Sequence, residues 1–169
     1  MLLGALSATA ALLAACSSSP GPLGNGGTPG QQCFPGRQGE PVTLGLYTLQ
    51  NNGTSAATIN SVRLPSDARG LKMTKAWVVP IYHDPKTGNL ELIGVGWPYP
   101  PTSQPTWPQR SPAAGAIVKP GQDLNLVFGL IRTTGGNGRS DGPVIVYTVN
   151  GSSYTIHEAV SLLLAAARC

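Results

Sequence analysis

Apolar and polar residues alternate along most of the chain beyond residue 41, in short runs that turn residues separate. The clearest run is residues 123–131, where alternate positions are Leu124, Leu126, Phe128 and Leu130. Because successive side chains of a strand point to opposite faces of a sheet, this pattern predicts a strand with one buried face. Residues 42–49 alternate in the same way, and the turn signal Asn51-Asn52-Gly53 follows them.

Weaker runs predict further strands at residues 58–64, 71–79, 90–97, 144–149, 153–157 and 159–168. Asn150-Gly151 is a strong hairpin signal between two of these runs. The turn residues at 84–89 predict that 71–79 pairs with 90–97. One face of 71–79 is expected to carry Leu71, Met73, Trp77 and Val79, and Lys75 interrupts it. The Leu and Ala residues of 159–168 favour a helix, but alternation favours a strand, which we prefer.

The composition limits the fold class. The chain is 41% hydrophobic and only 11% charged, with 22 Gly and 16 Pro, which suits many short strands joined by tight turns and does not suit a helical bundle. Residues 33–169 have the usual size of one domain. We therefore expect a single all-β domain over residues 33–169.

The order of turns and strands resembles a known class of domain. An Asn-Gly turn after the first strand, and Lys119-Pro120-Gly121 before the long alternating strand, are similar to the immunoglobulin-like domains of small bacterial lipoproteins, especially actinobacterial ones. The resemblance covers roughly residues 41–165. It implies an immunoglobulin-like antiparallel β-sandwich of about seven to nine strands in the cell envelope, and it supplies no catalytic residues.

The N-terminal residues 2–15 form an apolar stretch that is too short to span a bilayer. It ends in Leu13-Ala14-Ala15-Cys16, which resembles the cleavage site of a bacterial lipoprotein signal peptide. The resemblance implies that residues 1–15 are removed and that Cys16 carries lipid, palmitate included, at the extracytoplasmic face of the cell membrane. Residues 1–4 lack the usual positive charge, so we expect the natural start upstream. The alternative is a buried N-terminal helix with an incidental cysteine.

Residues 17–32 are rich in Ser, Gly and Pro and carry no charge, and Leu23 is the one large apolar residue among them. Such a segment predicts a flexible tether, with a root-mean-square span of about 20 Å.

With Cys16 assigned to lipid, two cysteines remain. Cys33 and Cys169 form an even pair in an oxidising compartment, which predicts a disulfide between them. Two free thiols or a metal-binding pair are the alternatives.

The chain offers little catalytic chemistry. His83 and His157 are its two histidines, and no nucleophile elbow accompanies them, so we expect no enzyme, no catalytic residue and no cofactor. Met73 with these two histidines could bind copper across two sheets, but the Cys, His and Met cluster of a blue-copper loop is absent. We expect no metal site, and we keep small-ligand or copper binding as the second hypothesis.

The net charge of +4 gathers in part at Arg63, Arg69, Lys72 and Lys75. Outside the cytoplasm, such cations suit anionic headgroups or envelope polymers rather than nucleic acid. The alternative is a solvated face without a partner.

Residues 94–112 combine many prolines with the aromatic residues Trp97, Tyr99 and Trp107. Prolines stiffen an extended loop, so these side chains are predicted anchors for a protein partner. Alternatively, they fold back over the sandwich, and the contact surface is then the basic stretch from Arg63 to Lys75. The expected function is that of a lipid-anchored envelope protein with a non-catalytic interaction module.

Overall fold

The computed structural model describes residues 21–26 and 30–169. Cys16, and with it the predicted signal peptide and lipidation site, lies outside the described residues. No helix within the described ranges is long and apolar enough to cross a membrane.

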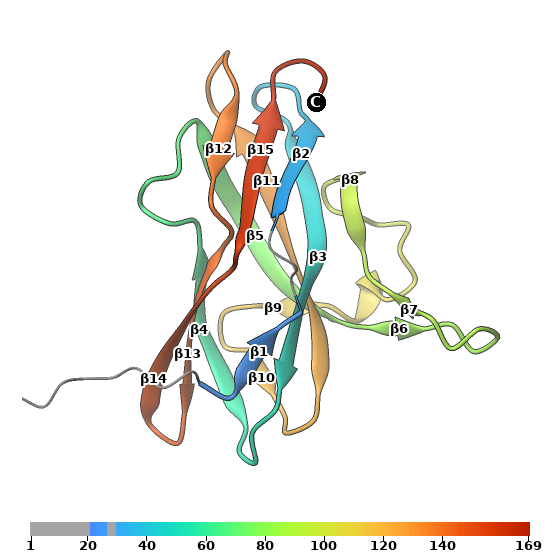
Figure 1. Ribbon diagram of the computed structural model, residues 1–169. Coiled ribbons are helices and arrows are strands. Elements are labelled where there is room, and N and C mark those ends of the chain that lie inside the picture. Colours follow the sequence, from blue (N-terminus) through green and yellow to red (C-terminus); the bar gives the residue numbers. More distant parts are fainter. Residues whose placement is uncertain (1–20, 27–29) are drawn as a thin grey trace, which may run out of the picture.

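The described strands form two layers that pack face to face (Figure 1). The first layer has the order β1 (Leu23–Asn25), β3 (Pro41–Asn51), β11 (Asp123–Arg132), β5 (Leu71–Pro80) and β9 (Ser111–Pro112), with β8 (Gly94–Pro98) also paired to β3. The second contains β10 (Ile117–Val118), β4 (Ala57–Arg63), β13 (Val144–Val149) and β14 (Ser152–His157), continued by β12 (Gly138–Ser140), β15 (Val160–Ala165) and β2 (Gly30–Pro35). A small hairpin of β6 (Tyr82–His83) and β7 (Leu90–Glu91) projects from the sandwich.

The fold is the all-β, immunoglobulin-like sandwich that the sequence predicts. The pairings between described residues are antiparallel apart from β2 with β15 and one isolated bridge between Gln38 and Arg132. The core lies between the layers, where β11 contributes Leu126, Phe128 and Leu130, each at most 1% exposed. The strand predicted at 159–168 is present as β15, and the Asn150-Gly151 hairpin joins β13 to β14. Both turn residues have positive φ, 49° and 80°, as a type I′ turn requires.

The predicted pairing of 71–79 with 90–97 is wrong. β5 pairs with β11 over its length and with β9 at Trp77 and Val78, whereas β8 pairs with β3. The turn at 84–89 joins only the two-residue strands β6 and β7. Pairing of β5 with β11 is favoured because it places both strands over the core. The pairing of β8 with β3 depends on Gly45, because a Cβ atom at that position would lie only 2.8 Å from Ile93 Cβ in the chain before β8.

The single apolar face predicted for 71–79 is also wrong, because β5 contains a bulge. Its register against β11 shifts between Phe128 and Leu130. An extra residue reverses which side chains point inward. Leu71 and Met73 consequently pack on the main core, whereas Trp77 and Val79 pack on the outer face of the first layer.

The tether predicted for 17–32 is wrong where the structure describes it. Leu23 is 4% exposed and lies in the core, and β1 pairs with the end of β3. Residues 30–32 begin β2, which pairs with β15. Strand pairing satisfies the backbone groups of this segment, so it needs few apolar side chains of its own. The folded domain therefore includes residues before Cys33.

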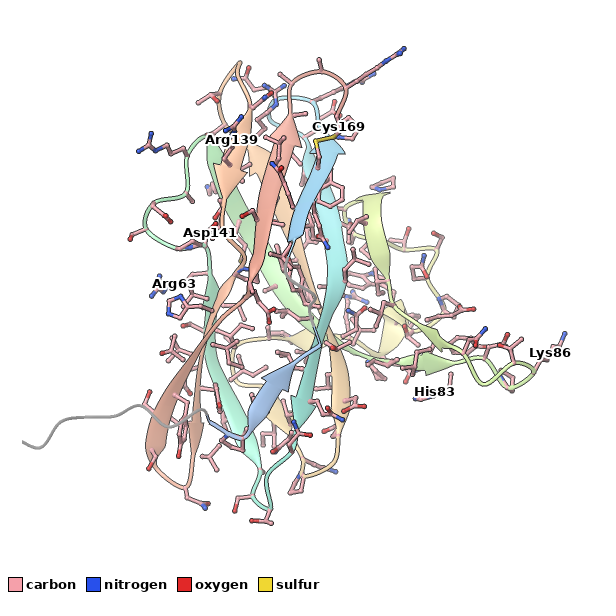
Figure 2. The ribbon with its side chains drawn as sticks, in the orientation of Figure 1. Arg63, His83, Lys86, Arg139, Asp141 and Cys169 are labelled. Carbon is pink, nitrogen blue, oxygen red and sulfur yellow. A yellow bond between two sulfur atoms is a disulfide. The ribbon has the colours of Figure 1, made fainter. Side chains whose placement is uncertain are left out.

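The structure joins Cys33 and Cys169 in the predicted disulfide, with their Cα atoms 5.7 Å apart. The bond links β2 to the chain after β15, at the end of the sandwich where the C-terminus lies (Figures 1 and 2).

Candidate interaction surface

The aromatic segment, residues 94–112, covers the outer face of the first layer. Trp107 is 3% exposed and packs edge to face on Trp77, with ring centroids 6.1 Å apart. The Arg110 guanidinium lies 4.7 Å from the Trp107 centroid and 5.4 Å from that of Trp77. The Tyr99 hydroxyl accepts a hydrogen bond from Trp77 Nε1 at 2.8 Å and donates one to the Lys75 carbonyl at 3.1 Å.

These contacts correct the prediction of exposed anchors. Trp107 belongs to a second small core with Val79, Ile93 and Val127, and Tyr99 is half-buried. The backbone of Trp97 lies in β8, and its side chain lies outside what the structure describes. The alternative interpretation, in which the aromatic residues fold back over the sandwich, holds for Trp107 and Tyr99. The contact surface must therefore be sought on the basic stretch.

A groove opens between β4 and β5 on one side of the sandwich. It consists of two adjoining hollows of about 420 and 340 Å³ that share Val62 and Ala76. We call it the β4–β5 groove, and its lining residues are Val62, Arg63, Leu64, Pro65, Ala68, Leu71, Lys72, Met73, Thr74, Lys75, Ala76, Trp77, Pro112, Ala113 and Ala114.

The groove exists because the chain connects the two layers at each end of the groove and leaves them unconnected along its length. On one side the chain runs from β9, paired with β5, to β10, paired with β4, and Ala113 N donates to the Ala76 carbonyl at 3.0 Å. On the other side Arg69 and Arg139 form a two-way backbone bridge of 2.8 Å bonds. Between these closures, residues 71–73 of β5 pair with β11 on one edge, Thr74 and Lys75 form the bulge, and no described strand pairs with residues 71–75 on the other edge.

The floor of the groove is apolar. Its half-buried side chains are an extension of the main core towards solvent, and they are Val62, Leu64, Leu71, Met73 and Ala76. Half-burial leaves part of their apolar surface available for a second molecule to cover.

The rim of the groove is positively charged. Arg63, Lys72 and Lys75 are exposed, and among the described lining residues none is Asp or Glu. Within residues 21–26 and 30–169 the one ion pair joins Arg37 to Glu40 at 3.7 Å, so these three cations are not compensated by a described carboxylate. The sequence predicted a cationic cluster that also included Arg69. In the structure, Arg69 lines a different hollow, on the other side of the connection formed by residues 64–70.

Two larger hollows of about 700 and 590 Å³ lie on that other side; the first has charges of both signs, and the second is lined by Asp67, Asp141, Glu158 and His157 without a Lys or Arg among its described lining residues. Asp67, Arg69, Arg139 and Asp141 line the first, and Ser161 Oγ donates to Asp141 Oδ1 at 3.1 Å. Figure 2 shows Arg63, Arg139 and Asp141 on the same side of the molecule. Sequence reasoning missed Arg139 and Asp141, because they follow β11 and only the fold brings them beside residues 64–70.

The residues of the copper hypothesis do not converge. Met73 lies in the groove, His157 lines the second large hollow, and His83 lies on the projecting hairpin at the opposite side of the view (Figure 2). No group of three His, Cys, Asp or Glu side chains in the described part of the chain could hold a metal ion.

Comparison with known proteins adds a distant structural likeness. No protein-family model matches the chain, and no curated protein matches its sequence. Among solved structures, the chain is similar to the ASH / PapD-like domain of human CEP192 (PapD-like domain 7), with 10% identity and a TM-score of 0.44 over 99% of each chain. The question of function therefore depends on the chemistry of the surface itself.

Proposed function

We propose that this protein is an extracytoplasmic lipoprotein whose β-sandwich is a non-catalytic interaction module, and that it binds its partner in the β4–β5 groove. The observation that carries the proposal is the combination of an apolar floor with three cations that form no ion pair with a described carboxylate. Desolvated apolar area provides affinity, and rim charges steer and select the partner.

We prefer the groove to the aromatic segment as the contact surface because the groove leaves more apolar surface exposed. Trp107 already fills a packed site between the segment and the sheet, so it has little surface to offer. The groove keeps apolar side chains half-exposed beside an unpaired strand edge. The larger of the two other hollows has carboxylates next to Arg69 and Arg139, which favours internal compensation over a charged partner. The smaller one has carboxylates without a Lys or Arg among the residues described there, and it lacks the apolar floor of the groove.

The anchoring part of the proposal follows from the N-terminal cleavage pattern at Cys16. The described domain starts at Gly21, so a fully stretched chain from Cys16 reaches only about 18 Å. A lipid on Cys16 would therefore hold the domain close to the membrane surface, so its partner is a membrane or envelope component.

Site-specific photo-crosslinking in the native envelope tests the proposal. A photoreactive residue in place of Thr74, in the groove, should crosslink a discrete envelope component. The matched position is Thr87, an exposed threonine beside Lys86 at the tip of the projecting hairpin (Figure 2). Identical crosslinking from both positions, or none from Thr74, would contradict the groove as the contact surface.

Anchoring is tested separately by Cys16→Ala in the full chain. The variant should move from the detergent phase to the aqueous phase, since a diacylglycerol supplies about 0.8 kcal/mol per buried methylene. Unchanged partitioning would contradict the lipid anchor and leave the groove untouched.

A further inference from the structure

We infer that the occupant of the β4–β5 groove is an extended peptide segment in which apolar and acidic residues alternate, and that it binds by adding a strand to the open edge of β5. The inference rests on the proposed function, and it adds the chemical class of the partner and its mode of binding.

The backbone of β5 supplies the first argument. Residues 71–73 pair with β11 on one edge, and Thr74 and Lys75 form the bulge of β5. On the other edge the described chain provides no strand until β9 reaches Trp77, although the Lys75 carbonyl already accepts a hydrogen bond from the Tyr99 hydroxyl. Unpaired N–H and C=O groups along a strand are a template for another extended chain. β4 is similarly open past Ile59, whose N–H and C=O bond to Ala116 and Gly115, so an added strand would enter a gap bounded by two unpaired edges.

The side chains supply the second argument. Every second residue of an added strand would point towards the core and meet the apolar floor at Leu71, Met73 and Val62. The intervening residues would face solvent beside exposed Lys72 and Lys75. Apolar residues complement the floor and acidic residues complement the rim, which together define an alternating apolar and acidic segment.

The same charges disfavour a second copy of this chain. Antiparallel pairing of β5 with β5 of another molecule would bring Lys72 and Lys75 against the same lysines, and like charges across a strand pair are destabilising. Anionic lipid or polymer could satisfy the cations, but neither would use the backbone edge of residues 71–75. Hydrogen bonding to the backbone edge of β5 therefore distinguishes a bound peptide from a bound anionic lipid or polymer.

The test uses the full chain in detergent micelles and an array of short synthetic peptides. Glutamate occupies alternate positions, and the remaining positions sample apolar residues. We expect members of the array to bind and to protect the amides of residues 71–75 from hydrogen exchange. N-methylation of alternate peptide amides should weaken binding about tenfold, because it removes the backbone hydrogen bonds that an added strand would donate. Lysine in place of glutamate should abolish binding.

Charge-reversal variants localise the effect. Lys72→Glu combined with Lys75→Glu should weaken peptide binding at least about tenfold, because each contact changes from attraction to repulsion. The matched control is Lys86→Glu combined with Lys119→Glu, which changes net charge equally at exposed positions outside the groove. Equal weakening by both pairs would show a general charge effect and overturn the inference.

Three further outcomes would also overturn it: no binding anywhere in the array, unchanged affinity of the N-methylated peptides, or equal protection of residues 71–75 by anionic lipid vesicles. The proposed function fails on a different observation, which is the loss of specific crosslinking at Thr74. Crosslinking at Thr74 without strand addition would retain the groove as an interaction site and reject the peptide as its occupant.

Discussion

At the scale of single residues, two buried tyrosines differ in how their hydroxyls are satisfied. Tyr47 is 1% exposed, and its hydroxyl has no hydrogen-bond partner among the described residues. Burial, and secondarily the negative charge of Glu158, raise the pKa of Tyr47 well above its usual range, so the phenol is neutral. Tyr147 is fully buried, and its hydroxyl accepts a hydrogen bond from Leu23 N at 3.3 Å.

The first prediction compares the two hydroxyls by deletion. Tyr47→Phe removes a buried polar group without a partner, so the free energy of unfolding should stay unchanged or rise by about 1 kcal/mol. Tyr147→Phe is the matched control and should lower it by about 1 kcal/mol, because it leaves Leu23 N without its partner. Urea denaturation of both variants measures the difference. A loss for Tyr47→Phe as large as that for Tyr147→Phe would contradict the assignment.

Single residues also show which parts of the fold local sequence cannot predict. Asn125 faces away from the main core in the alternating strand, which suggests exposure, yet it is 1% exposed. Its side chain accepts a hydrogen bond from Ile93 N and donates to the Gly45 and Tyr47 carbonyls, all at 2.9 Å. The chain around Ile93 covers this face, and that cover is a long-range contact without a local signal.

At the scale of elements, the sequence predicts well where one local pattern decides the structure. β11 follows from its alternation, and the β13–β14 hairpin follows from Asn150-Gly151. Prediction from sequence fails where a partner strand or a bulge determines the structure, as in the reversed face of β5 and the pairing of β8 with β3. The candidate site divides in the same way, because its cations lie close in sequence whereas its open edge depends on strand order.

The second prediction concerns the aromatic segment as an element that covers the first layer. Trp107→Ala should lower the free energy of unfolding by about 3 to 5 kcal/mol, because it leaves a cavity beside Trp77 and removes the cation–π contact with Arg110. Ile117→Ala is a suitable control, since that side chain is 57% exposed and should change stability little. Thermal denaturation compares them. Equal, small losses would show that the segment does not complete a core.

At the scale of the whole molecule, the disulfide joins residues that are 136 positions apart in sequence. The third prediction is that its loss costs about 4 to 5 kcal/mol, because the bond restricts a long loop in the unfolded chain. Reductant should lower the Tm of the wild-type chain and leave that of the Cys33→Ser, Cys169→Ser double variant unchanged. A wild-type Tm that does not respond to full reduction would show that strand pairing alone holds β2 on β15.

If Cys16 carries a lipid, as we propose, the path of the N-terminal strand decides which end of the domain faces the membrane. The Pro22 carbonyl accepts a hydrogen bond from Asn52 N at 3.0 Å, so the chain enters the domain beside the turn between β3 and β4. That turn and the β13–β14 turn lie at one end of the sandwich, and the C-terminus and the β11–β12 turn lie at the other (Figure 1). A tether of at most about 18 Å from Cys16 would hold the first end towards the lipid headgroups.

The fourth prediction tests this orientation in lipidated protein reconstituted into vesicles. A nitroxide at Asn52, an exposed residue of the β3–β4 turn, should be strongly broadened by nickel-chelating lipids, because the short tether keeps that turn near the headgroups. A nitroxide at Thr133, an exposed residue after β11, should be broadened little, since the length of the sandwich separates it from the membrane. Addition of a long Gly/Ser insert after Cys16 should reduce the difference, because a flexible linker releases the domain from a fixed height. Equal broadening at Asn52 and Thr133 without the insert would contradict the orientation, and the β4–β5 groove on the side of the sandwich would then have no fixed direction relative to the membrane.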